Sequence, residues 1–133
     1  MALTADRNTP YRNGDTISAP VAASTTIYAG ALVCADASGN AVPGATATTL
    51  TYLGRASEHV DNSAGSAGDV SIAIDHGKAF LFKNSGADAV TQASLGKVCY
   101  IVDDETVAAT DGTSTRSAAG KVIEVSSEGV WVL

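Results

Sequence analysis

Short apolar runs, separated by Gly, Asn, Asp and Pro, recur along the chain from residue 31 onward. In residues 69–75, apolar side chains alternate with small or polar ones, which is the pattern of a strand with one buried face. Comparable runs predict strands at 31–36, 50–56, 69–75, 78–83, 97–102, 106–109, 121–125 and 130–133. The glycine at position 54 is expected to bend the second of these strands.

Strands at this spacing are typical of small sandwiches and barrels. Only residues 91–95 favour a helical turn, ended by Gly96. Residues 97–102 are apolar on both faces and are expected to form a central strand, and residues 121–133 read as a hairpin. We therefore predict an all-β fold, a small single-domain antiparallel β-sandwich or barrel with at most one short helix, over residues 16–133.

Residues 1–15 show neither helical nor strand periodicity and are expected to form an extended N-terminal arm. Such a segment is either a frayed terminus or an arm that becomes ordered on a partner. Arg7, Tyr11 and Arg12 are the candidate contact residues. A tyrosine flanked by two arginines is adhesive in a protein that is otherwise acidic.

Composition and charge lower the expectation of several function classes. Ala, Gly, Ser and Thr make up nearly half of the chain, so the core must be thin, and its Val and Ile favour strands. The net charge of −6 repels phosphate backbones and anionic lipids, so neither nucleic acid nor membrane is expected as a partner. No apolar run approaches transmembrane length, and the N-terminal segment lacks the apolar stretch of a secretory signal.

The two histidines are the candidates for acid–base chemistry. His76 follows Asp75, but adjacent strand residues point to opposite faces, so the two side chains need not meet. His59 lies beside Glu58, and for both histidines a surface or turn position is the favoured interpretation. No nucleophile elbow, dinucleotide-binding loop or phosphate-binding loop occurs, so the chain is not expected to be an enzyme.

Cysteines and carboxylates give no clear metal or redox site. Cys34 and Cys99 lie in apolar runs without cationic neighbours and are expected to be buried, unreactive thiols, although one disulfide stays open. Zinc would need more closely spaced ligands. The cluster of residues 103–105 (Asp-Asp-Glu) lacks the pattern of a calcium loop, so a solvated acidic turn is favoured over a calcium site. No cofactor is expected.

Several glycine-plus-apolar motifs resemble the capsid cement, or head decoration, proteins of tailed bacteriophages and prophages. The motifs lie at residues 28–33 (YAGALV), 53–56 (LGRA), 95–107 (LGKVCYIVDDETV), 119–125 (AGKVIEV) and 129–132 (GVWV). The resemblance spans most of residues 16–133. It carries no catalytic motif.

This resemblance implies a virion structural protein, made in the bacterial host cytoplasm and located on the outer capsid surface. It implies a homotrimer that binds the major capsid protein and clamps neighbouring capsomers after the head expands. Two alternatives stay open: another phage component, such as a tail or fibre module, and a small carbohydrate-binding β-sandwich. Sugar binding usually needs exposed aromatic side chains, and the seven aromatic residues leave few for that purpose.

Overall fold

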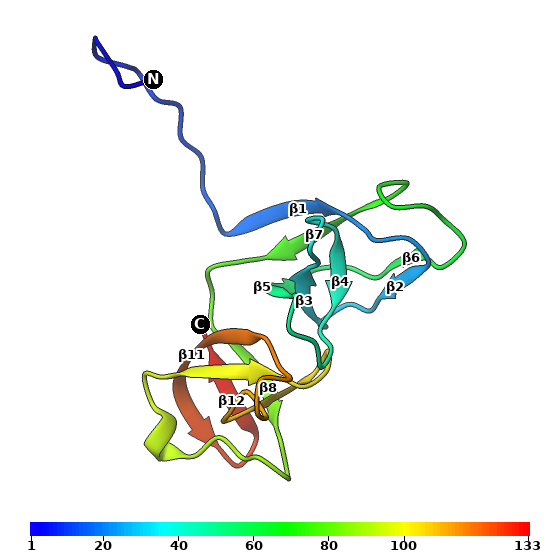
Figure 1. Cartoon of the computed structure of the whole chain (residues 1–133), viewed down its shortest axis with the longest axis vertical. Coiled ribbons are helices and arrows are strands. Elements are labelled where there is room, and N and C mark those ends of the chain that lie inside the picture. Colours follow the sequence, from blue (N-terminus) through cyan, green and yellow to red (C-terminus); the bar gives the residue numbers. More distant parts are fainter.

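The computed structural model describes residues 1–133 and is built almost entirely of β-strands (Figure 1). The single helix is a short 3-10 turn, η1 (Gln92–Ser94). The strands are β1 (Thr16–Pro20), β2 (Thr25–Ile27), β3 (Leu32–Ala35), β4 (Ala41–Pro43), β5 (Thr51–Ala56), β6 (Val60–Asn62), β7 (Ser71–Asp75), β8 (Phe80–Asn84), β9 (Val98–Ile101), β10 (Thr106–Ala108), β11 (Ala118–Ser126) and β12 (Gly129–Val132). The all-β prediction is confirmed. The structure contains no helix with the length and apolar character that a membrane crossing requires.

The strands from the first half of the chain form an antiparallel sheet in the order β1-β7-β5-β3-β4. A bridge between Val21 and Ala41 connects the chain after β1 to the far edge strand, β4, so the sheet curls toward closure. β2 and β6 form a separate two-stranded ribbon. We call this half, residues 16–75, the upper lobe, after its place in Figure 1.

The strands from the second half form a closed barrel in the order β10-β8-β12-β11-β9. Its strand pairs are antiparallel except for β10 with β8, which run parallel. The barrel forms because Phe80 and Phe82 on β8, and Val130 and Val132 on β12, turn inward at alternating positions.

The two halves have separate hydrophobic cores that share β3. Leu32 and Cys34 belong to the barrel core, whereas Val33 belongs to the core of the upper lobe. All three side chains are fully buried, so β3 is covered on both faces. This explains why its sequence, Leu-Val-Cys, is continuously apolar instead of alternating.

Polar contacts also join the halves. The backbone N–H of Leu32 donates to the carbonyl oxygen of Asp104 at 2.7 Å, and the hydroxyl of Thr46 donates to the carbonyl of Val102 at 2.8 Å. The buried hydroxyl of Ser117 donates to the carbonyl of Ala47 at 2.7 Å and accepts a hydrogen bond from Leu50 N–H at 3.1 Å. The barrel and the upper lobe are therefore fastened at several points.

All eight predicted strands are found, with shifts of a few residues at their ends. The expected hairpin is the pair β11 and β12, and the expected helical turn is η1. The bend at Gly54 is a β-bulge, because the register between β3 and β5 shifts opposite it. Residues 97–102 differ from the prediction: β9 is shorter and has one buried face, carrying Cys99 and Ile101, while Val98 is exposed. In a closed barrel every strand has two neighbours, so no strand is central.

Candidate functional site

The N-terminal arm, residues 1–15, is exposed along its whole length and extends away from β1 (Figure 1). Its one hydrogen bond to the rest of the chain joins His76 N–H to the carbonyl oxygen of Asp15 at 3.0 Å. The other hydrogen bonds of the arm lie within it, between Arg7 and Thr9. The arm is thus tied to the upper lobe only at its root.

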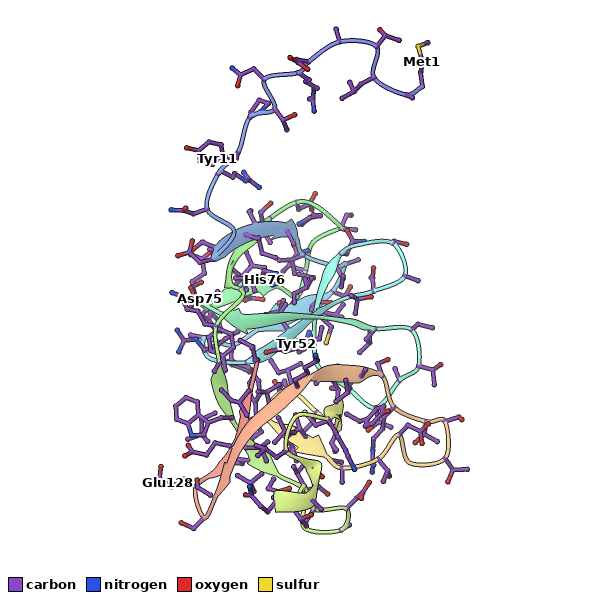
Figure 2. All side chains as sticks on the ribbon, turned by 90° about the vertical axis from the view of Figure 1, so that its left-hand side faces the viewer. Met1, Tyr11, Tyr52, Asp75, His76 and Glu128 are labelled. Carbon is purple, nitrogen blue, oxygen red and sulfur yellow. The ribbon has the colours of Figure 1, made fainter.

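The three candidate residues on the arm make no contact with the body, and only Arg7 has a partner, the hydroxyl of Thr9 within the arm. Tyr11 is 98% exposed, and Figure 2 shows it well clear of the strands. The ion pairs of the molecule involve Arg55, Lys83 and Arg116, so the guanidinium groups of Arg7 and Arg12 take part in none. One phenol and two cations are therefore available to a partner along one extended segment.

At the root of the arm, Asp75 and His76 have separate partners. The carboxylate of Asp75 accepts a hydrogen bond from Arg55 at 2.7 Å, and this contact lowers the pKa of Asp75. The imidazole of His76 instead contacts the carbonyl oxygen of Leu53. The structure therefore does not form the carboxylate–histidine pair considered from the sequence.

A shallow, open depression of about 460 Å³ lies where the two halves meet. Its lining comes from the loop before β3 and from the turn between β9 and β10: Tyr28, Ala29, Gly30, Ala31, Asp104 and Glu105. Tyr28 is 63% exposed, and its ring packs against the imidazole of His59 at 5.2 Å between centroids, tilted by 51°. The lining thus combines an exposed aromatic residue with two acidic residues.

The acidic cluster at residues 103–105 is spread over different partners. The carboxylate of Asp103 accepts the N–H of Glu105, and the carboxylate of Glu105 forms an ion pair with Lys83 at 3.0 Å. Burial, followed by the nearby charge of Asp103, raises the pKa of Asp104. No group of three or more His, Cys, Asp or Glu side chains is placed to hold a metal ion.

The two cysteines are buried free thiols, as expected from the sequence. Burial raises the pKa of Cys34 to about 12 and that of Cys99 to about 11. The thiolate fraction at neutral pH is therefore minute, which suits packing and disfavours nucleophilic or metal-binding roles.

Sequence reasoning identified the arm but missed the depression, whose aromatic and acidic residues are far apart in the sequence. The hydrogen bond from Leu32 to Asp104 brings their two segments together, and no local sequence motif indicates that contact. Comparisons of the chain with protein-family models, curated proteins and solved structures find no match in any of the three.

Proposed function

We propose that this chain is a non-enzymatic structural protein of a tailed-phage or prophage virion. In this proposal it binds the major capsid protein on the outer surface of the head, as a homotrimer, and stabilises the expanded shell. The resemblance of residues 28–33, 53–56 and 95–132 to cement proteins supports the phage assignment. The observation that carries the proposal is the contrast between a closely packed β body, residues 16–133, and an arm with exposed contact groups.

The arm suits attachment to a large, fixed surface. Its fifteen residues can span roughly 50 Å when extended. Because the arm is tied only at its root, it would become ordered on contact, at an entropic cost that only a correctly shaped surface offsets. Attachment would then select the expanded geometry of the shell.

The distribution of charge is compatible with an outer location. The arm carries two Asp and two Arg, so the whole net charge of −6 lies on the body. A body with this charge is repelled by packaged DNA and by anionic membranes. The acidic body would face solvent while the neutral arm contacts the shell.

Shell stabilisation follows from linkage. A ligand that binds the assembled shell and not the dissociated subunits shifts the equilibrium toward assembly. A trimer presents three arms at once, so modest contacts combine through a high effective concentration. No reaction chemistry is required.

Removal of the arm tests the proposal. A chain lacking residues 1–15 should keep the circular dichroism spectrum and melting temperature of the full chain, because the arm makes one hydrogen bond to the body. Its binding to expanded phage heads, measured by co-sedimentation, should be lost.

A finer comparison uses the full-length chain. Replacing Arg7, Tyr11 and Arg12 together by alanine should weaken head binding at least about tenfold, since aromatic and arginine contacts dominate most interfaces. The matched control replaces Thr4, Asn8 and Asn13 by alanine and should bind normally. Undiminished binding by the arm-deleted chain would refute the role of the arm.

One observation favours a second candidate, carbohydrate binding. Tyr28 offers an exposed ring next to a depression with two carboxylate acceptors, which is a suitable arrangement for a sugar face and its hydroxyls. A glycan array probed with the full chain would test it, with Tyr28→Ala as the inactive variant. An array without signal would remove this candidate.

A further inference from the structure

The outward side of the barrel carries a continuous group of exposed apolar side chains. They are Leu81, Ile123, Trp131 and Leu133, which we call the apolar face. Three of them are between 38 and 53% exposed, and Trp131 is half-buried. Single exposed apolar residues are ordinary on soluble proteins, but a contiguous group marks an interaction surface.

Strand register makes these side chains neighbours. Trp131 on β12 lies opposite Leu81 on β8 and opposite Glu124 on β11. The backbones of Leu133 and Lys121 exchange two hydrogen bonds, at 2.9 and 3.0 Å. Side chains that lie directly opposite on adjacent strands stand about 5 Å apart, so these residues touch across the sheet.

Ile123 extends the face, which lies on the three adjacent strands β8, β12 and β11. Val98, opposite Lys121 on β9, lies further round the closed barrel and is not part of it. The register shift between Val122 and Glu124 is a β-bulge that leaves both Ile123 and Glu124 exposed. A regular strand would have turned one of these two side chains inward.

We infer that the apolar face is where a second copy of this chain binds. Its charge supports this occupant. Lys121 and Glu124 lie within the face, and Lys83, on the same side of β8, is paired with Glu105, so the charges here balance, whereas the body as a whole is strongly acidic. Two copies can therefore approach here without net repulsion, with Lys121 of one copy near Glu124 of the other.

Other occupants fit less well. The arm of the same chain leaves from β1, at the far end of the molecule from the barrel (Figure 1). The barrel is closed, so an added strand would find no free edge there, and contact must be made by side chains. Around a two-fold axis the face contacts the same face of the other copy, and around a three-fold axis only the part of the face nearest the axis contacts the same part of the other two copies.

This inference deepens the proposed function and rests on it for the choice of a second copy. The test measures the mass of the purified full chain by light scattering at protein concentrations from about 1 to 100 µM. This range detects association with a dissociation constant of up to about 100 µM. The wild-type chain should have a mass of two or three protomers. Leu81→Glu should be monomeric, and Ile123→Glu provides a second variant if the first folds poorly. Leu3→Glu, the same change at an exposed leucine of the arm, should behave as wild type.

The fluorescence of Trp131 provides an independent readout, because it is the only tryptophan in the chain. Its emission should shift to the blue as the wild-type chain associates and should stay constant in Leu81→Glu. A monomeric wild-type chain throughout the range would overturn the inference. An oligomer that neither Leu81→Glu nor Ile123→Glu disrupts would also overturn it, because association would then use another surface.

Binding to phage heads separates this inference from the proposed function. A chain that associates through the apolar face but ignores expanded heads upholds the inference and refutes the proposed function. A wild-type chain that is monomeric in solution and binds heads through its arm refutes the inference. It upholds head binding by the arm but not the homotrimer of the proposed function.

Discussion

Tyr52 places a buried hydroxyl between the two halves of the molecule without a hydrogen-bond partner. The residue lies on β5, and its ring meets the edge of Phe82 in the barrel at 6.4 Å between centroids. Burial is the main reason that the pKa of Tyr52 is raised above its usual value. Burying a hydroxyl without a partner costs about 1 to 3 kcal/mol, which the packing of the ring must offset.

Removal of that hydroxyl should therefore do no harm. We expect Tyr52→Phe to raise the free energy of unfolding by about 1 kcal/mol, measured by urea denaturation. Tyr52→Ala is the companion variant and should destabilise by about 3 to 5 kcal/mol, because it leaves a cavity beside Phe82. A clear loss of stability in Tyr52→Phe would mean that the hydroxyl has a partner in solution.

Asp104 should make stability depend on pH in the direction opposite to Asp75. Its raised pKa means that the folded state holds the proton more tightly than the unfolded chain does. Stability is therefore lost as the pH rises from the ordinary carboxyl pKa through the raised one. For Asp75 the pKa is lowered, so its contribution is present at neutral pH and is lost as the pH falls.

Two asparagine substitutions should separate these effects. Asp104→Asn should raise the melting temperature at pH 7 by about 1 to 3 °C and have little effect near pH 3, where Asp104 is protonated in both states. Asp75→Asn should lower it at pH 7, because Arg55 loses its partner. Equal responses of Asp104→Asn at the two pH values would contradict the explanation.

At the scale of elements, the meeting of β5 with β7 depends on one glycine. Gly54 has a φ of +149°, and a Cβ atom there would overlap the backbone carbonyl of Asp75 on β7. Backbone cannot yield as a flexible side chain can, so Gly54→Ala should destabilise by about 3 kcal/mol or more. Gly39→Ala is the control, since Gly39 also has a positive φ but open space around it, and it should cost only about 1 kcal/mol. Similar losses in urea denaturation for the two variants would exclude the overlap as the cause.

Strands with their own hydrophobic pattern could be predicted, and strands without one could not. The alternation in residues 69–75 and the apolar run of β3 identified these elements directly. β2, β4 and β6 have three residues each and few large apolar side chains, so they are strands only because neighbouring segments pair with them. β1 is absent from the predicted strands for a related reason: only Ala19 of its five residues is buried, and its pairing partner, β7, lies more than fifty residues away.

At the scale of the whole molecule, the exposure of the arm could be predicted because it is a local property of composition. The depression and the apolar face could not. Tyr28 meets Asp104 only after the two halves have packed together. Closure of the barrel turns the side chains of Val130 and Val132 into the core. The side chain of Trp131, which lies between them in the sequence, therefore points outward.

β3 contributes side chains to both cores, and this should determine how the molecule unfolds in solution. Neither half can release Leu32, Val33 or Cys34 while keeping its own packing, because the side chains alternate between the two cores. The amide hydrogens of these residues should therefore exchange with solvent deuterium only when the whole body unfolds. Denaturation should accordingly be one cooperative transition, and damage to either half should weaken both.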